Sequence, residues 1–380
     1  MALRLTRSSR RVCVALLCLF TSVLTGCGGG SVTLSSSPPP PPTPKFAYVA
    51  NRMSDDISAY TINATSGALT PMPGSPFAGG TQPSVAATDP LGKFVYVANA
   101  LSDDVSAYSV NGATGGLTPV VGSPFAAGTT PVGVTVEPLG RFVYVTNHIS
   151  NDISAYTLNT GSGALTPVAG SPFPAGTVPG VLAVVPSGKF AYVANVTSND
   201  VSAYSINPAT GGLTPVAGSP FPAGMGAFGV AIDPSGKFLY VANAFSDDVS
   251  AYSIDSTSGA LTPVPGSPFP AGDFPFGVAV DPSGKFVYVA NGLSGNVSAY
   301  TISAASGALT PVPGSPFPGG GFPTLVAVEP AGKFVYVTNE TSNDVSAYSI
   351  NATTGALTPV TGSPFAAGTT PIGVVVVRQP

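Results

Sequence analysis

The chain has 380 residues and a formal net charge of −4, and its 46 glycines and 41 prolines stand beside only 8% charged residues. Hydrophobic residues make up 44% of the chain, too many for a disordered polymer, and glycine does not recur at every third position as collagen requires. The low charge argues against long surface helices, and the acidic balance argues against nucleic acid as a partner. We therefore expect apolar strands joined by many turns.

The first 26 residues are predicted to be a secretory signal peptide. Arg4, Arg7, Arg10 and Arg11 precede an apolar run over residues 12–23, which is too short to span a bilayer as a helix. The run ends in Leu-Thr-Gly-Cys at residues 24–27, which resembles the bacterial lipobox. The resemblance implies lipidation of Cys27, a membrane partner held through that lipid, and an exported protein anchored in the bacterial cell envelope, at the outer membrane, the cell surface or the periplasm. The alternative is an ordinary cleaved signal with a chance cysteine.

The remaining cysteines and the next segment agree with that interpretation. Cys13 and Cys18 would leave with the signal peptide, so Cys27 becomes the only cysteine of the mature chain. An intramolecular disulfide, a cysteine nucleophile and a cysteine metal site are then excluded. Residues 27–44, which are rich in Gly, Ser and Pro, are predicted to be a linker that holds a domain away from the membrane.

Residues 45–380 consist of seven repeats of 48 residues without an insertion. All 14 tyrosines occupy two positions of the repeat. A basic residue followed by Phe-x-Tyr-Val opens each unit, at Lys45, Lys93, Arg141, Lys189, Lys237, Lys285 and Lys333. Such a period indicates a repeat architecture.

Each unit predicts four short antiparallel strands. In one unit these are residues 93–99, 105–110, 117–120 and 132–136. The third contains a proline and suits an edge, whereas the fourth has small side chains and suits the crowded centre of a ring. The pattern predicts an all-β fold, a seven-bladed β-propeller with four antiparallel strands per blade. An open β-solenoid is the alternative.

The phase of the repeat favours a closed ring. The first unit begins with a second strand at residues 46–49, and the chain ends with an innermost strand at residues 372–377. The C-terminal strand would therefore complete the N-terminal blade. Closure of this kind removes the open sheet edges that promote aggregation.

Recurring sequence motifs point to a family. Tyr-Val-Ala-Asn or Tyr-Val-Thr-Asn, as at residues 144–147 and 336–339, is followed by Val-Ser-Ala-Tyr and Leu-Thr-Pro-Val in unit after unit. This pattern resembles the YVTN and lactonase-type seven-bladed propellers over residues 45–380, and the enzymes of that group include 6-phosphogluconolactonases. The resemblance implies the propeller fold and lactone hydrolysis as an activity.

In the lactonase branch, one blade carries Gly-Pro-Arg-His before its innermost strand and Asn-Glu after its Tyr-Val strand. Here Asn339 and Glu340 match the second motif, while Thr324 and Leu325 stand where the resemblance places Arg and His. The resemblance thus implies Glu340 as an acid–base residue without its usual partners.

The position after the Asn of the Tyr-Val-Ala-Asn motif varies most. It holds Arg52, His148 and Glu340 in three units, and His148 is the only histidine of the chain. One interpretation is a residual acid–base group at the mouth of the channel. The other is drift at a solvated loop position, with a salt bridge between Arg52 and Glu340. The position of His148 two blades away from Arg52 favours this second interpretation.

Five phenylalanines depart from the repeat. They fall in loops of one face, in three consecutive blades: Phe228, Phe245, Phe274, Phe276 and Phe322. They predict either a docking site for a protein, a glycan or a hydrophobic ligand, or a plug packed in the channel.

A ring of Asp residues recurs beside these loops, beginning with Asp55 and Asp56 in the first unit. Calcium needs six or more converging oxygens, and these carboxylates are spread around a wide ring, so we expect Asx-type turns bonded to their own backbone instead. We expect no metal site and no cofactor.

Three functions are compatible with these observations. The departure from the Arg-His motif and the five phenylalanines favour a non-catalytic binding or scaffold module that uses the loop face. A lactonase-like hydrolase with a degenerate active site and a purely structural envelope protein are the alternatives.

Overall fold

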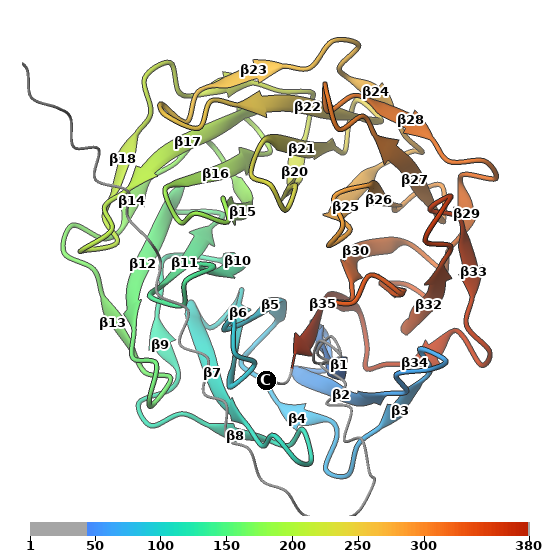
Figure 1. The fold of residues 1–380 in the computed structure, drawn as a ribbon. Helices are drawn as coiled ribbons and strands as arrows, with labels where there is room; N and C mark the ends of the chain where they lie inside the picture. Colours follow the sequence, from blue (N-terminus) through green and yellow to red (C-terminus); the bar gives the residue numbers. More distant parts are fainter. Residues whose placement is uncertain (1–43, 379–380) are drawn as a thin grey trace, which may run out of the picture. The chain divides into compact units, whose positions relative to one another are not determined.

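The computed structural model describes residues 44–378. The predicted signal peptide, Cys27 and the linker up to residue 43 lie outside the described residues. Residues 44–378 form seven antiparallel sheets arranged as blades around a central axis (Figure 1). The predicted all-β seven-bladed propeller is thereby confirmed. Within this range no helix has the length and apolar character that a membrane crossing requires.

The innermost strand of each blade begins with proline or alanine and carries mostly small or β-branched side chains, because the blades converge at the axis. We number the blades one to seven by these strands. They are β5 (Pro83–Thr88), β10 (Pro131–Val136), β15 (Pro179–Val184), β20 (Ala227–Ile232), β25 (Pro275–Val280), β30 (Pro323–Val328) and β35 (Pro371–Arg378).

The second strand of each blade is buried from its phenylalanine onward and pairs with its neighbours on both sides. From blade one to blade seven the second strands are β6 (Phe94–Asn99), β11 (Phe142–Asn147), β16 (Phe190–Asn195), β21 (Phe238–Asn243), β26 (Phe286–Asn291), β31 (Phe334–Asn339) and β1 (Pro44–Asn51). The third strands follow in the same order as β7 (Asp104–Val110), β12 (Asp152–Leu158), β17 (Asp200–Ile206), β22 (Asp248–Ile254), β27 (Asn296–Ile302), β32 (Asp344–Ile350) and β2 (Asp56–Ile62).

The outer position of each blade is split between two short segments, of which sequence analysis expected only the first. The first segments are β8 (Leu117–Pro119), β13 (Leu165–Pro167), β18 (Leu213–Pro215), β23 (Leu261–Pro263), β28 (Leu309–Pro311), β33 (Leu357–Pro359) and β3 (Leu69–Pro71). The second are β9 (Phe125–Ala126), β14 (Phe173–Pro174), β19 (Phe221–Pro222), β24 (Phe269–Pro270), β29 (Phe317–Pro318), β34 (Phe365–Ala366) and β4 (Phe77–Ala78). Between the two, the Ser123 hydroxyl accepts the Ala107 amide at 2.8 Å, so a side chain takes the place of a strand partner.

Blade seven joins the two ends of the described chain. Strand β35 pairs with β1 over most of its length, and the order across this blade is β3-β2-β1-β35. The predicted closure of the ring is therefore confirmed. The ladder leaves no open edge between the first and last units.

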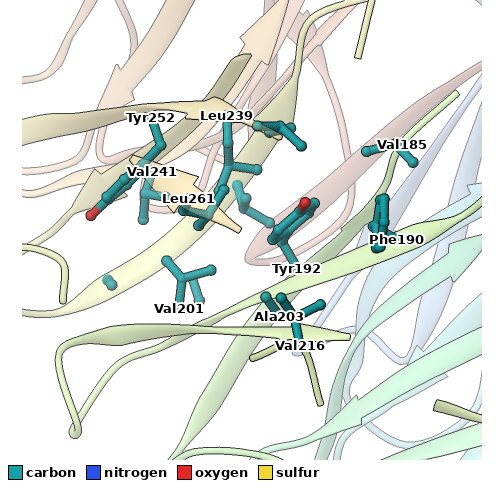
Figure 2. Packing of buried hydrophobic residues seen from close by; sticks show 14 residues of the cluster. Val185, Phe190, Tyr192, Val201, Ala203, Val216, Leu239, Val241, Tyr252 and Leu261 are labelled. Atoms are coloured by element: carbon teal, nitrogen blue, oxygen red, sulfur yellow. The ribbon is translucent and has the colours of Figure 1, made fainter. Parts of the chain in front are cut away.

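The core lies between the blades. Seven apolar clusters are present, one at each interface, because alternate residues of every strand face the two neighbouring blades. At the interface of blades three and four, Tyr192 and Val201 pack with Leu239 and Tyr252 (Figure 2).

Tyrosine hydroxyls form hydrogen bonds across each interface between blades. Tyr96 donates to the Gly163 carbonyl of the following blade at 2.9 Å, and Tyr108 donates to the Ala78 carbonyl of the preceding blade at 2.7 Å. The pattern recurs in every blade, so all 14 tyrosines cross an interface. Burial raises the pKa of these hydroxyls above the ordinary value of 10.0.

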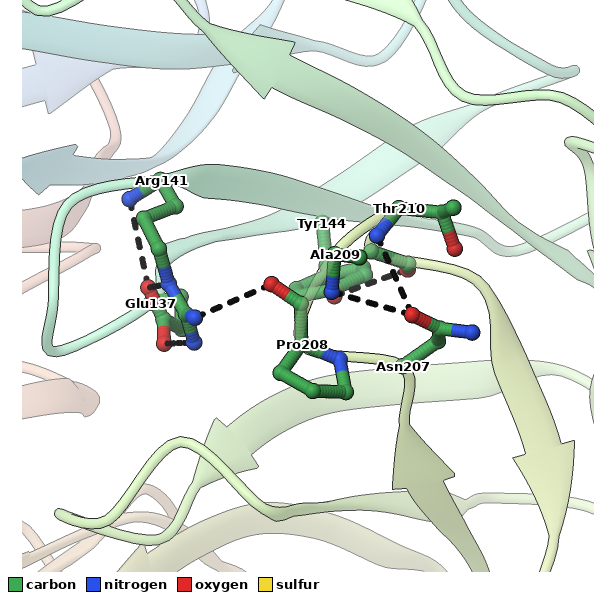
Figure 3. Close-up of polar contacts among 8 residues, drawn as sticks. Glu137, Arg141, Tyr144, Asn207, Pro208, Ala209 and Thr210 are labelled. Atoms are coloured by element: carbon green, nitrogen blue, oxygen red, sulfur yellow. Dashed lines mark hydrogen bonds and ion pairs between the residues drawn. The ribbon is translucent and has the colours of Figure 1, made fainter.

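One interface carries an additional charged contact. Arg141, which replaces the lysine of the other units, pairs with the fully buried Glu137 at 2.5 Å and donates to the Pro208 carbonyl of the next blade at 3.1 Å (Figure 3). Glu137 also accepts the Arg141 backbone amide, so the carboxylate closes its own turn. The pair connects blades two and three.

Glycine is required where a tyrosine hydroxyl meets the next blade. Gly211 has a φ of 77° and accepts the Tyr144 hydroxyl, and a Cβ at this position would overlap the ring of Phe142. We expect Gly211→Ala to lower the free energy of unfolding by about 2–4 kcal/mol, through strained backbone and a forced shift of a core ring. Urea unfolding followed by circular dichroism measures the change.

The neighbouring glycine provides a matched control. A Cβ on Gly212 would meet only Thr210 Oγ1 at 3.4 Å and Phe173 at 3.8 Å, and its φ is not in the left-handed region. Gly212→Ala is therefore expected to change stability by less than about 1 kcal/mol. Equal losses in the two variants would contradict the role assigned to Gly211.

Candidate active site at the channel mouth

One face of the propeller, here called the loop face, is formed by the loops that follow the second strands and those that precede the innermost strands. Backbone hydrogen bonds join the two kinds of loop within each blade, as between the Arg52 amide and the Thr370 carbonyl at 2.8 Å and between the His148 amide and the Thr130 carbonyl at 2.8 Å. The variable position after each Asn is therefore held beside the start of an innermost strand. It is this geometry that directs the variable residues toward the axis.

A cavity of about 340 Å³ lies at the mouth of the channel on the loop face. Arg52 and His148 both line it, although they come from blades seven and two. The residue between them on the ring is the small Ala100. The separation of two blades therefore does not keep the two side chains apart, because the ring is narrow at its axis. The complete lining consists of Arg52, Gln82, Ala100, Thr130, Val132, His148, Val196, Phe228 and Phe276.

His148 is held in a defined orientation. Its Nδ1 lies 3.2 Å from the Pro179 carbonyl oxygen, which can only accept, so Nδ1 carries the proton and Nε2 retains a free lone pair. Burial lowers the pKa of the imidazole and the charge of Arg52 acts in the same direction, while the bond to Pro179 opposes them. The half-buried His148 is therefore a neutral base at physiological pH.

Arg52 is a cation without a full set of partners. Its Nε is buried and has no hydrogen-bond partner, and burial lowers the pKa of the guanidinium. The one ion pair within residues 44–378 is that of Arg141 with Glu137, so the anticipated salt bridge between Arg52 and Glu340 is not formed. A buried donor left unpaired costs about 1–3 kcal/mol, which a ligand oxygen would recover.

Glu340 lies in blade six, next to Arg52 on the ring, with its backbone amide bonded to the Phe322 carbonyl at 2.9 Å. It is half-buried and is not part of the cavity lining. Its negative charge raises the pKa of Arg52 and so partly offsets the effect of burial. The geometry gives Glu340 an electrostatic influence on Arg52 rather than contact with the cavity.

The two residues at the Arg-His position of the lactonase branch have other surroundings. Thr324 is buried and its Oγ1 lies 2.9 Å from Thr338 Oγ1 and 3.1 Å from the Ile372 carbonyl oxygen. Leu325 packs against the cluster that contains Val85. Blade six therefore supplies neither a cation nor an imidazole to the cavity. The cation comes from blade seven and the imidazole from blade two.

The five additional phenylalanines form one continuous cluster. Phe228 and Phe276 stack with ring centroids 3.8 Å apart, and Phe274 lies 6.2 Å from Phe276. Phe274 also contacts Phe245 and Phe322, at 5.7 and 5.6 Å. The cluster begins in the cavity, where Phe228 is 9% exposed, and reaches the surface at Phe245, which is 59% exposed.

The Asp ring bonds partly to the next blade and partly to an Asn side chain of its own blade, so the expectation of local Asx turns was wrong. Asp55 has a φ of 56° and accepts the Gln82 amide of the next blade at 2.7 Å. Asp56 accepts Asn51 Nδ2 at 2.6 Å, and this Asn also reaches Ser58. The ring thus positions the loops that line the cavity. Asx turns form instead between the third and outer strands, as at Asn63.

Two further features of the site bear on its chemistry, namely its capacity to hold a metal ion and its additional polar side chains. Among the described residues, no three His, Cys, Asp or Glu side chains gather as they would to hold a metal ion. Gln82 and Thr130, which sequence analysis missed, add polar groups to the cavity. They occupy the position before the innermost strand, where the same comparison of units singled out Phe274 and Phe322. Variation at that position was the signal that could have found them.

A seven-bladed propeller with a base, a cation and an aromatic wall at its channel mouth is the class that the fold and the site define. The chain belongs to the lactonase family of seven-bladed β-propellers. The family model "Lactonase, 7-bladed beta-propeller" matches residues 41–132, 121–228, 218–318 and 315–375. The predicted family resemblance is confirmed.

Solved structures share the fold at low sequence identity. A proposed 6-phosphogluconolactonase from Bacteroides fragilis has a TM-score of 0.78 and 21% identity, covering 90% of this chain and 100% of its own. A periplasmic gluconolactonase from Pseudomonas aeruginosa has a TM-score of 0.76 and 18% identity, covering 88% of this chain and 99% of its own. Hydrazine synthase from Kuenenia stuttgartiensis also matches, with a TM-score of 0.59 and 20% identity, covering 86% of this chain and 99% of its own.

A search of curated proteins gave no match. Because such different proteins share the propeller, the fold alone does not determine the reaction.

Proposed function

We propose that the protein hydrolyses lactones in the cavity at the channel mouth. One observation supports this above all: the unpaired guanidinium of Arg52 and the oriented, neutral imidazole of His148 line the same cavity in a propeller of the lactonase family. A general base and a cation for a developing oxyanion are the two groups that ester hydrolysis needs.

The proposed reaction uses these groups in sequence. The lactone carbonyl oxygen faces Arg52, and a water molecule lies between the carbonyl carbon and His148 Nε2. His148 takes a proton from the water as its oxygen attacks, and Arg52 stabilises the negative charge that develops on the carbonyl oxygen. The ring C–O bond then breaks, the leaving oxygen takes the proton from His148, and a hydroxy acid is released.

The experiment is a measurement of acid release from glucono-δ-lactone and δ-valerolactone by the purified protein without its signal peptide. The expected result is hydrolysis of at least one of the two lactones well above its spontaneous rate. A rate equal to the blank for every lactone tried would refute the proposal.

The pH dependence follows from the state of His148. Because burial lowers its pKa, the basic form is already dominant below pH 6.5, the ordinary value. We expect kcat/KM to be constant at neutral pH and to fall tenfold per unit once the pH drops below the pKa of His148. A plateau that begins above pH 7, after subtraction of spontaneous hydrolysis, would contradict this assignment.

Glu340 is expected to contribute little. Glu340→Gln removes only the charge that offsets the burial of Arg52, so kcat/KM should fall by about two- to fivefold, as for other partly solvated charge pairs. Initial rates at saturating and limiting lactone measure the change. Complete loss of activity would instead make Glu340 the acid–base residue that the family resemblance implies.

Binding without catalysis is a second candidate function, favoured by the phenylalanine cluster that reaches the surface at Phe245. A protein or glycan partner would then be retained by the immobilised propeller and lost on combined Phe274→Ser and Phe276→Ser substitution. Retention of such a partner, together with blank rates on lactones, would favour binding over hydrolysis.

For localisation, we propose export and lipid anchoring through Cys27, supported by the basic head, the apolar run and the lipobox-like sequence. Cys27→Ala is expected to abolish incorporation of labelled palmitate and to release the protein from the membrane fraction. Unchanged fractionation would exclude the anchor.

A further inference from the structure

The cavity has two chemically different sides. Its polar groups, Arg52, Gln82, Thr130 and His148, come from blades seven, one and two. Phe228 and Phe276 form the wall supplied by blades four and five. A ligand that places a carbonyl group at the polar side therefore turns its remaining substituents toward aromatic rings.

The charges of the loop face disfavour an anionic ligand. Arg52 is the only lysine or arginine that residues 44–378 place on this face, because the others lie at the start of second strands or at the end of β35, on the opposite face. The other charged residues of the loop face are carboxylates distributed over its loops: Asp55, Asp56, Asp103, Asp104, Asp152, Asp200, Asp247, Asp248, Asp273, Glu340 and Asp344. A phosphate dianion would meet a single guanidinium within a negative field.

The aromatic wall continues out of the cavity. From the stacked pair of Phe228 and Phe276, the contacts pass to Phe274 and then to the half-buried Phe322 and the exposed Phe245. The rings form an apolar track from the reacting centre to solvent, long enough to hold more than a lactone ring.

The loop face also carries exposed apolar side chains outside the cavity. The residue that follows each variable ring position is a large hydrophobic side chain in five of the seven units, and a methionine precedes β20 on the same face. Each is more than half exposed: Met53, Leu101, Ile149, Met225, Phe245 and Leu293. An apolar substituent that leaves the cavity thus stays in contact with apolar surface.

We propose that the cavity takes uncharged lactones that carry an extended apolar substituent, and not phosphorylated or polyhydroxylated sugar lactones. The proposal rests on lactone hydrolysis as the function of the site. The ring carbonyl is bound between Arg52 and His148, the substituent lies along Phe228, Phe276 and Phe274, and the sugar hydroxyls or phosphate of a sugar lactone would find an aromatic wall in their place.

The test compares kcat/KM for four lactones: δ-decanolide, δ-valerolactone, glucono-δ-lactone and 6-phosphoglucono-δ-lactone. The pentyl group of δ-decanolide is expected to raise kcat/KM at least about tenfold over δ-valerolactone, and both should exceed the two sugar lactones. Phe276→Ser should remove most of the advantage of δ-decanolide. Leu91→Ser, at an apolar residue 51% exposed on the opposite face, should leave all four rates unchanged.

A binding measurement separates this proposal from the proposed function. The lactam analogue of δ-decanolide, 6-pentylpiperidin-2-one, is not readily hydrolysed and is expected to bind at least tenfold more tightly than gluconolactam in calorimetry. Hydrolysis with a preference for either sugar lactone would overturn the proposal and leave lactone hydrolysis standing. Preferred binding of the pentyl lactam without hydrolysis of any lactone would refute the function and retain the ligand class. No preference in either measurement would overturn the proposal.

Discussion

Replacing His148 with glutamine is expected to lower kcat/KM for lactone hydrolysis by about 10²–10⁴-fold, the usual contribution of a positioned general base. Glutamine can still fill the space beside the Pro179 carbonyl and donate a hydrogen bond to it, but it offers no basic nitrogen to the cavity. Because the chain has no other histidine, no second imidazole can substitute.

Two readouts distinguish loss of the base from a change in structure. The acid limb of the pH profile, which follows deprotonation of His148, should disappear from the residual activity. Thr197→Gln, an exposed position of the next blade outside the cavity lining, should retain full activity. If His148→Gln kept both the rate and the acid limb, the base would lie elsewhere.

Arg52→Met is the complementary change. It retains much of the apolar stem and removes the cation, so kcat should fall by about 10²–10³-fold if the guanidinium stabilises the oxyanion. The combined His148→Gln and Arg52→Met variant should be much less impaired than the product of the two single effects, because groups that act in one transition state are not additive.

The second large effect is alkaline unfolding. Each of the 14 tyrosines donates its hydroxyl across a blade interface, and burial raises the pKa of each above 10.0 in the folded protein. A group whose pKa is raised by folding stabilises the folded state fully below its unfolded pKa and loses that contribution as pH rises. The interfaces are therefore stable at neutral pH and become unstable above about pH 10.

The slope of that loss is large because the tyrosines act together. Above its unfolded pKa, each tyrosine lowers the free energy of unfolding by about 1.4 kcal/mol per pH unit. The 14 together therefore remove a typical stability of about 5–15 kcal/mol within about one pH unit. We expect tyrosinate absorbance to rise and the circular dichroism signal of the strands to fall in one coincident step. Gradual ionisation near pH 10 with the fold intact would contradict this interpretation.

Tyr96→Phe should slightly reduce the slope of stability against pH in the alkaline range. At neutral pH it should lower the free energy of unfolding by about 1 kcal/mol, because the hydrogen bond to Gly163 is lost.

In a repeat protein, the residues that differ between units are the candidates for function, and these residues can be identified from the sequence. Arg52, His148 and Glu340 were found because one position differs between units, and Gln82 and Thr130 would have been found by the same comparison one loop away. Their distances could not be predicted. Whether a side chain two blades away is near or far depends on how closely the inner strands approach the axis.

The sequence by itself determined the propeller. A 48-residue period, strands with alternating apolar side chains, a proline-bearing rim and a phase that lets the last strand complete the first blade admit few other arrangements, because each unit can bury its two faces only against copies of itself. The tertiary structure alone decided the chemistry of the loop face. It placed His148 and Arg52 around one cavity and left the Arg52 Nε unpaired, it buried Thr324 away from that cavity, and it joined the five phenylalanines into a continuous wall. Contacts of this kind depend on the radius of the closed ring and on which loops are hydrogen-bonded to each other. Neither can be derived from the spacing of residues along the chain.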